Sequence, residues 1–240
     1  MVINVHAGHN ADGYTATGAV GYVKESVEDR LIKDAVIKYL QQDGNTVYDC
    51  TVDNAPSQNA NLSGIVSKCN AHHVDLDVSI HLNAGAADKD EHTTGSEVYV
   101  YNKTGSSYPA AQRICDKLAS LGYCNRGVKV NQSLYVLRKT NAQALLVECF
   151  FVDDKNDVDV YHRLGADKIG KAIAEGIVGH LINEPAPAQN AITYTVKKGD
   201  SLWKIAQEQL DNGARYKEIV NANGLINNTI HPGDKLIMPN

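Results

Sequence analysis

The first part of the chain changes from a helical to a strand-like spacing of apolar residues. From 25 to 40 the apolar positions recur at steps of three and four, which is the spacing of one helix face. This predicted helix ends at Gly44, because glycine is a common helix terminator. Between 74 and 80 apolar and polar residues alternate, which predicts a strand that carries His81 on its polar face.

The same change of spacing continues toward the C-terminus. Strand-like segments lie at 1–5, 46–48, 96–101 and 144–151, and helical segments lie at 110–121 and 166–182. Helices that alternate with strands are typical of an α/β layer. We therefore expect a twisted, largely parallel sheet flanked by helices.

A short Ala/Pro-rich stretch divides the chain into two parts. The sequence EPAPAQNA at 184–191 has no apolar periodicity and is typical of a stiff, extended linker. We predict a catalytic domain at 1–183, a linker at 184–192 and a small domain at 193–240. A domain of about 50 residues is near the lower size limit for independent folding.

Composition excludes several classes of protein. Of 240 residues 43% are hydrophobic, and the formal net charge is −5, so no long-range attraction to nucleic acid or to an anionic membrane is expected. No apolar run reaches the roughly 20 residues of a membrane span. The five cysteines are an odd number without CxxC spacing, which favours reduced thiols over a disulfide framework. The chain starts on a strand-like segment, so we expect no signal peptide and synthesis in the cytoplasm.

Three distant segments each lead from an apolar run into a side chain that can bind a metal. They end in His9, His81 and Glu148. The carboxyl ends of parallel strands meet at one edge of a sheet, where such side chains converge. Two histidines and one carboxylate, with a fourth position for water, form the ligand set of a catalytic zinc site. The pattern therefore indicates a zinc hydrolase.

The surroundings of these residues strengthen the interpretation. Gly8 allows a sharp turn ahead of His9. Glu148 lies between apolar residues on both sides, where an unpaired carboxylate is costly, so a metal, a water or a cation should lie nearby. The alternative is a buried ion pair, for which Arg138 or Lys139 could supply the cation.

In their order along the chain, these segments resemble one enzyme family. The set GHN at 8–10, Glu25, SIHLNA at 79–84 and LVECFF at 146–151 resembles the zinc-dependent N-acetylmuramoyl-L-alanine amidases of autolysins and phage endolysins, over residues 1–182. The resemblance implies one Zn²⁺ held by His9, Glu25 and His81, with Glu148 as general base. Glu28 competes with Glu25, being one helical turn away.

The family activity is hydrolysis of the amide between N-acetylmuramic acid and L-alanine, with a zinc-bound water as nucleophile. Asn10 and Asn83 are candidate substrate-binding residues beside the ligands. His6 stands where the family commonly has Asp, and it is either a partner that orients a ligand or a strand residue. A zinc peptidase that cuts within the stem peptide, a wall-binding protein with an inactive catalytic domain and a glycosidase are the rival functions.

The C-terminal part resembles a second, independent family. YTVKKGDSLWKIA at 194–206, NANGL at 221–225 and IHPGDKLIMP at 230–239 resemble a LysM domain of strand-helix-helix-strand order. The resemblance implies binding of N-acetylglucosamine-containing glycans through two loops, with candidate residues Gly199, Asp200, Ser201, Leu202, Ile226 and Asn227.

Both resemblances point to peptidoglycan as the partner, with no nucleic acid and no membrane. We expect a monomer that acts at the bacterial cell wall. It would be either a phage or prophage endolysin released by a holin, or a secreted autolysin.

Overall fold

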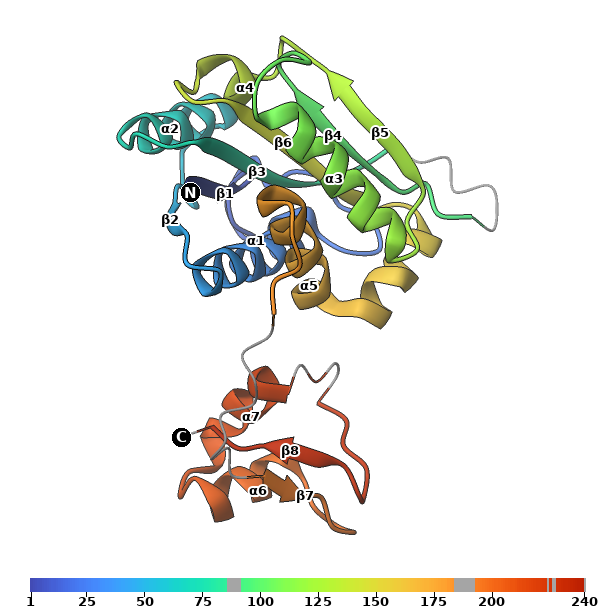
Figure 1. Cartoon of the computed structure of the whole chain (residues 1–240). Helices are drawn as coiled ribbons and strands as arrows, with labels where there is room; N and C mark the ends of the chain where they lie inside the picture. The colour runs from blue at the N-terminus through green and yellow to red at the C-terminus, as the bar shows by residue number, and fades with distance from the viewer. Residues whose placement is uncertain (86–91, 184–192, 224, 226–227, 240) are drawn as a thin grey trace. The chain divides into compact units, whose positions relative to one another are not determined.

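The structure is a computed structural model, and it describes residues 1–240 except 86–91, 184–192, 224, 226–227 and 240. The chain forms two compact units, Met1–Ile182 and Asn183–Asn240 (Figure 1). The linker predicted at 184–192 lies outside the described residues, as do Ile226 and Asn227.

The large unit is built on a six-stranded sheet. Its order is β2-β1-β3-β6-β4-β5. The strands are β1 (Val2–Ala7), β2 (Thr46–Asp49), β3 (Leu76–Asn83), β4 (Ser96–Val100), β5 (Asn125–Val130) and β6 (Ala144–Phe151). All neighbouring pairs are parallel except β4 and β6, which are antiparallel. The prediction of a largely parallel sheet flanked by helices is confirmed.

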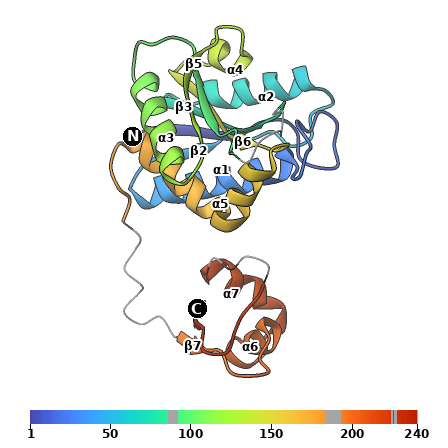
Figure 2. The same ribbon diagram turned by 90° about the vertical axis from the view of Figure 1, so that its right-hand side faces the viewer.

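Helices cover both faces of the sheet (Figure 2). One face packs against α1 (Glu25–Gln42), α3 (Ser107–Ser120) and α5 (Lys155–Val178). The other packs against α2 (Gln58–Asn70) and the short α4 (Tyr135–Lys139). Because parallel sheets bury both faces, their strands carry apolar residues with little alternation.

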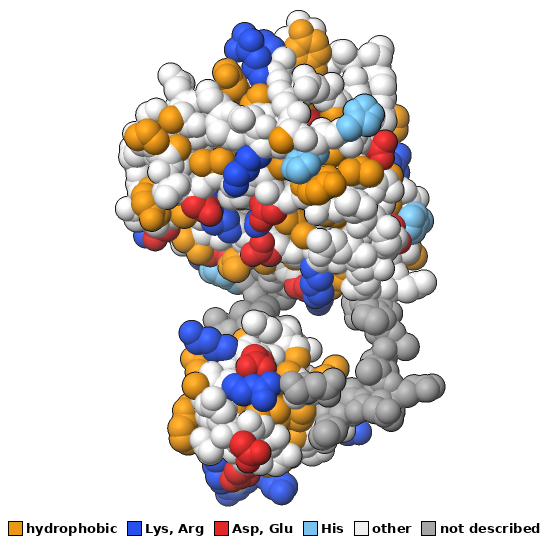
Figure 3. All heavy atoms as spheres, turned by 90° about the vertical axis from the view of Figure 1, so that its left-hand side faces the viewer, with side chains coloured by type: hydrophobic (Ala, Val, Ile, Leu, Met, Phe, Trp, Pro, Cys, Tyr) orange, Lys and Arg blue, Asp and Glu red, His pale blue; other side chains and the backbone are white. Residues whose placement is uncertain are grey.

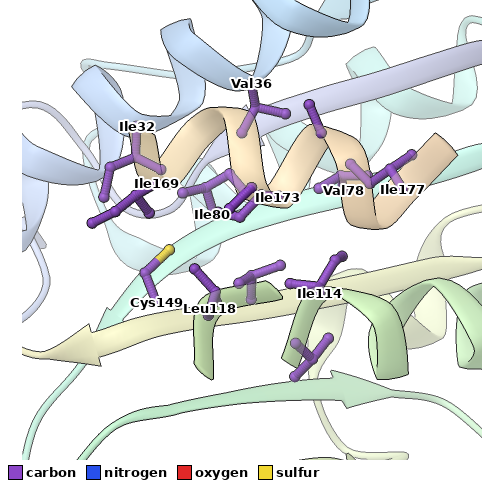
Figure 4. Packing of buried hydrophobic residues seen from close by; sticks show 14 of the residues in the cluster. Ile32, Val36, Val78, Ile80, Ile114, Leu118, Cys149, Ile169, Ile173 and Ile177 are labelled. Carbon is purple, nitrogen blue, oxygen red and sulfur yellow. The ribbon is translucent and has the colours of Figure 1, made fainter. Parts of the chain in front are cut away.

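The main core lies between the sheet and the α1, α3 and α5 layer. Figure 4 shows Ile169, Ile173 and Ile177 of α5 packed in one cluster with Ile80 of the strand β3 and Ile114 of the neighbouring helix α3. These side chains are almost fully buried. Burying one such side chain contributes about 1.5–3 kcal/mol, so this layer fixes the sheet that carries the candidate site.

The structure differs from the sequence-based prediction in several elements. The closing helix begins at Lys155 and not near 166, because Asp154 caps it by accepting hydrogen bonds from two backbone N–H groups. Gly165 interrupts it with a non-helical conformation, which hides the earlier part from a periodicity search. The sequence patterns do not predict α2, α4 or β5. The alternation in β3 predicted a polar face, yet Asp77 and Ser79 are buried beneath the second helical layer.

The small unit has strand-helix-helix-strand order, as predicted. Its elements are β7 (Thr193–Thr195), α6 (Leu202–Gln209), a 3₁₀ turn (Gly213–Arg215), α7 (Tyr216–Asn223) and β8 (Lys235–Ile237). The two strands pair antiparallel. Its core contains Leu202, Ile205, Ile219 and Leu236.

Among the described residues, no helix combines the length and apolar character that crossing a bilayer requires. All five cysteines are free thiols.

Candidate active site

Three elements bring His9, Glu25 and His81 to one place. β1 and β3 pair in parallel, and the N–H of Gly8 donates to the Ile80 carbonyl at 2.9 Å just beyond the end of β1. This bond sets His9 beside His81, so that the two ring centroids are 5.0 Å apart. Glu25, the first residue of α1, approaches from the neighbouring helix.

The carboxylate of Glu25 contacts both imidazoles. Oε1 is 3.0 Å from Nδ1 of His81, and Oε2 is 3.4 Å from Nε2 of His9. Backbone N–H groups hold the same oxygens, with Leu82 donating to Oε1 at 3.1 Å and Ala19 donating to Oε2 at 2.7 Å. The carboxylate is therefore oriented by the chain itself.

These contacts shift the ionisation of both partners in opposite directions. Burial favours the neutral form of Glu25, but hydrogen bonds and charges of His81 and His9 outweigh burial and lower its pKa. Burial likewise opposes the charged form of His9, but the hydrogen bond and charge of Glu25 raise its pKa. The site therefore holds a negatively charged carboxylate between two imidazoles.

Two glycines make this close approach possible. A Cβ at Gly8 would lie 2.0 Å from Cε1 of His81. A Cβ at Gly18 would lie 2.3 Å from Oε2 of Glu25 and 2.7 Å from Cδ2 of His9. Real Cβ atoms do not approach other atoms this closely, so both positions require glycine while the three side chains stay in place.

The donor set fits Zn²⁺. One ligand atom from each of His9, Glu25 and His81 lies within 4.8 Å of the other two. Tetrahedral zinc with ligand distances of about 2.0–2.1 Å places its ligand atoms roughly 3.3 Å apart. The two carboxylate–imidazole contacts have similar lengths and use different oxygens of Glu25, 3.0 Å from Oε1 to His81 and 3.4 Å from Oε2 to His9. Two imidazoles and a carboxylate, with one position left open, are typical of catalytic zinc.

Glu148 lies beside this group, and no described residue forms an ion pair with it. It is the register partner of His81 across β3 and β6. Its Oε2 is buried without a hydrogen-bond partner in the part of the chain that the structure describes. Within that part no ion pair joins it to Arg138 or Lys139, so the buried ion pair considered from the sequence does not form. Burial first, and then the charges of Glu25 and Glu97, raise its pKa to about 8.

A second carboxylate stands next to Glu148. Glu97 of β4 is its register partner, and its own charge is balanced by Arg126, whose Nε donates at 2.8 Å. Asn83 also donates to Glu97 from 3.0 Å. Asn83 is half-buried beside the ligands, and its substrate-binding role remains a prediction.

The position of Asn10 corrects the expectation of a substrate contact. Its side chain is fully buried. The amide donates to the carbonyls of Thr15 and Ala55, and its oxygen accepts from Ala55 and Asn61. These bonds use both donor hydrogens and both acceptor positions, so Asn10 holds the loop after β1.

The structure also shows the surroundings of Glu28 and His6, whose roles the sequence left open. Glu28 contacts the hydroxyl of Tyr161, on the side of α1 that faces α5. His6 lies with Nδ1 3.2 Å from the Ala7 carbonyl and 3.5 Å from Oγ of Ser79. Burial lowers the pKa of His6 to about 4, so the imidazole is neutral near pH 7.

The described candidate glycan-binding residues of the small unit contact neighbouring parts of that unit. Asp200 accepts from the N–H of Lys197 and from the Tyr194 hydroxyl, both at 2.8 Å. Ser201 caps α6, and Leu202 is buried in the small core. Gly199 has a left-handed backbone and open space around it.

Sequence reasoning missed Arg30 and Asn61, which contact the backbone of His9. Neither has a motif or a spacing that links it to His9. The exposed face in Figure 3 shows acidic and basic side chains of the large unit lying close together. Charged side chains are common on such a surface, so an arginine carries no functional signal in the sequence alone.

Comparison with known proteins identifies the family of each unit. Residues 3–179 match the N-acetylmuramoyl-L-alanine amidase family, and residues 194–239 match the LysM domain. An uncharacterised protein of Clostridium perfringens is 40% identical over 225 residues, covering 91% of this chain and 65% of that protein. The endolysin of Bacillus phage SPP1 is 34% identical over a match that covers 63% of this chain and 61% of the endolysin. The chain thus spans less than two thirds of the length of these relatives.

Solved structures agree with the family match. The catalytic domain of the CD27L endolysin targeting Clostridia difficile is 31% identical, covers 76% of this chain and 99% of its own, and has a TM-score of 0.66. The amidase AmiC2 of Nostoc punctiforme is 25% identical, covers 75% of this chain and 96% of its own, and has a TM-score of 0.63. The chain belongs to the N-acetylmuramoyl-L-alanine amidase family and carries a C-terminal LysM domain.

Proposed function

We propose that the chain is a zinc-dependent peptidoglycan amidase. It hydrolyses the amide bond between N-acetylmuramic acid and the L-alanine of the stem peptide. The observation that carries this proposal is the convergence of His9, Glu25 and His81, with the unpartnered carboxylate oxygen of Glu148 beside them.

Each residue has a defined role in this reaction. His9, Glu25 and His81 hold the metal, and Zn²⁺, when bound, supplies a Lewis acid that polarises the scissile carbonyl and lowers the pKa of a water. Glu148 accepts the proton of the attacking water and returns it to the departing amine of L-alanine. A raised pKa suits this double role, because the protonated acid is then stable near neutral pH.

Two further groups support the site. Glu97 places a second negative charge next to Glu148, which favours the proton-holding form of that base. Asn83 stands between the ligands and Glu97, where its amide would bind a substrate carbonyl or hydroxyl.

The LysM domain would bind the glycan part of the same polymer. Weak binding by one module raises the local concentration of the other at the wall, without new contacts to the scissile bond. We propose that this chain acts at the bacterial cell wall as an endolysin or an autolysin.

The substitution Glu148→Gln tests the assignment of the base. Glutamine keeps the size of the side chain but cannot accept the proton, so turnover should fall by about a hundredfold or more, as general-base effects do. Zinc content should stay at one ion per chain, because Glu148 is not among the three ligands.

Glu28→Gln is the matched control, since Glu28 lies one helical turn from Glu25 and contacts Tyr161. It should keep both zinc and most of the turnover. The assay is release of L-alanyl peptide from a soluble muramoyl-peptide, with zinc measured by atomic absorption. Full turnover in Glu148→Gln would contradict the proposed role.

A further inference from the structure

His9 adopts a backbone conformation that a side chain-bearing residue rarely takes. Its φ is 57°, in the left-handed region that favours glycine. This conformation turns the chain sharply after Gly8 and directs the imidazole toward Glu25. Such a conformation persists only where the surroundings fix it, so some contact must hold the backbone of His9.

Arg30 of α1 supplies one such contact. Its guanidinium donates to the carbonyl of His9 from Nη2 at 3.1 Å and to the carbonyl of Gly8 from Nη1 at 3.3 Å. Two successive carbonyls are therefore bound by one rigid, planar group. Lysine could not reproduce this, because its ammonium acts as a point charge.

Asn61 of α2 supplies the second contact. It is 1% exposed, and its Nδ2 lies 3.0 Å from the same His9 carbonyl. The same nitrogen lies 2.8 Å from Oδ1 of Asn10 and from the carbonyl of Val52. The two hydrogens of the Asn61 amide are shared among these three acceptors. The His9 carbonyl is thus contacted from α1 by Arg30 and from α2 by Asn61.

Arg30 is itself fixed by two carboxylates. Asp29 accepts from Nη1 at 3.0 Å, and Asp53 accepts from Nε at 3.0 Å. The outer side of Arg30 lines a surface cleft of about 440 Å³ together with other charged residues. Because this side is open, water can replace part of the guanidinium in a variant without leaving a sealed void.

We propose that Arg30 and Asn61 are positioning residues for His9, holding its strained backbone so that the imidazole faces Glu25 and His81 before a metal binds. This inference rests on the proposed function only in that His9 is a zinc ligand. Neither residue touches the metal, so their effect is on the free energy of zinc binding. Residues that orient ligands in this way typically change metal affinity by about 10–100-fold when replaced.

The test compares Arg30→Gln with Arg113→Gln. Arg113 of α3 also donates to two backbone carbonyls, those of Gly176 and Ile177 at 2.8 and 2.9 Å. It therefore controls for the loss of an arginine that binds two carbonyls away from the metal site. Zinc affinity is measured on the full chain by competition with a chromogenic chelator, and stability by urea unfolding of the metal-free protein.

We expect Arg30→Gln to bind zinc about 10–100-fold more weakly than wild type, while Arg113→Gln binds it within about twofold. Asn61→Asp, which removes the donor at unchanged size, should also weaken zinc binding, and Arg30→Lys should lie between wild type and Arg30→Gln. In the metal-free Arg30→Gln protein the amide hydrogens of Asn10 and Ala11 should exchange faster, because their bonds to Ala16 and Asp53 depend on this loop.

Equal zinc affinity in Arg30→Gln and Arg113→Gln would overturn the proposal. If Arg30→Gln does not fold, wild-type affinity in both Arg30→Lys and Asn61→Asp would overturn it. Failure of the proposed function is a separate result. If wild type binds zinc but cleaves no muramoyl-peptide, the amidase assignment is wrong and the positioning role is still decided by the affinities. If wild type binds no zinc, the ligand set is wrong and both proposals fall.

Discussion

Two glycines in the loop between β1 and α1 offer a matched test of the metal site. Gly13 and Gly18 both have positive φ values, 89° and 79°. An alanine at either position costs backbone strain of about 1–2 kcal/mol. A Cβ at Gly13 meets nothing within 4 Å, whereas a Cβ at Gly18 would lie 2.3 Å from Oε2 of Glu25.

The difference between the two variants therefore isolates the metal site. To reach an ordinary contact of about 3.4 Å, Glu25 or the loop must move by roughly 1 Å, while zinc sites tolerate about 0.2 Å in ligand distance. We expect Gly18→Ala to weaken zinc binding by about 100-fold or more. Gly13→Ala should keep wild-type affinity. In the metal-free form Gly18→Ala should lose more stability than Gly13→Ala, because it also displaces the Glu25 carboxylate from the N–H groups of Ala19 and Leu82.

Affinity is measured by chelator competition at equilibrium, and stability by urea unfolding of metal-free protein. Wild-type zinc affinity in Gly18→Ala would refute the reasoning, because it would show that Glu25 and His9 do not need the positions seen here to bind the metal.

Three further predictions concern the ligand set, the fold and the linker. Glu25→Gln should lose zinc at equilibrium dialysis, while Glu28→Gln should retain it. Loss of zinc from Glu28→Gln alone would show that Glu28 is the ligand. Asp154→Ala should lower the free energy of unfolding by about 1–2 kcal/mol because it removes the cap of α5, whereas the exposed Asp159→Ala should change it by less than about 0.5 kcal/mol. Burial tends to raise the pKa of Asp154, but hydrogen bonds from Thr94 and from backbone N–H groups outweigh burial and lower it. The difference in unfolding free energy between wild type and Asp154→Ala should therefore be present above about pH 4 and shrink as the pH falls further. An unchanged difference at low pH would contradict this cause. Cleavage within 184–192 should leave hydrolysis of a soluble muramoyl-peptide unchanged and slow hydrolysis of sacculi at low enzyme concentration; equal loss on both substrates would exclude a targeting role.

The sequence predicted the parts of the fold that follow simple periodicity. The helix after Glu25 and the apolar strand before Glu148 are long and regular, and the structure places both as expected. The segment at 58–70 forms α2, but its apolar residues are few and mixed with Asn and Ser, so no helical period was visible. The antiparallel direction of β4 depends on tertiary pairing with β6, which no local pattern encodes.

The candidate site was predictable where a metal-binding residue type occurs at the carboxyl end of a predicted strand. His9 follows β1 and His81 lies near the end of β3, so their meeting at the sheet edge follows from the parallel pairing of these strands. The role of Asn10 was predicted wrongly, because a polar residue beside a ligand looks the same in sequence whether it faces substrate or the loop interior. Arg30 acts through its donors on the Gly8 and His9 carbonyls, and backbone contacts of this kind leave no trace in sequence spacing.

We propose that this chain cleaves the bond between the glycan and its stem peptide. The most direct test is mass analysis of the fragments that the zinc-loaded full chain releases from purified sacculi. We predict peptides with a free L-alanine amino terminus, intact glycan strands without new reducing ends, and loss of both products after treatment with a strong chelator. Peptides with an internal amino terminus would identify an endopeptidase, and new reducing ends would identify a glycosidase; either result would contradict the proposed amidase.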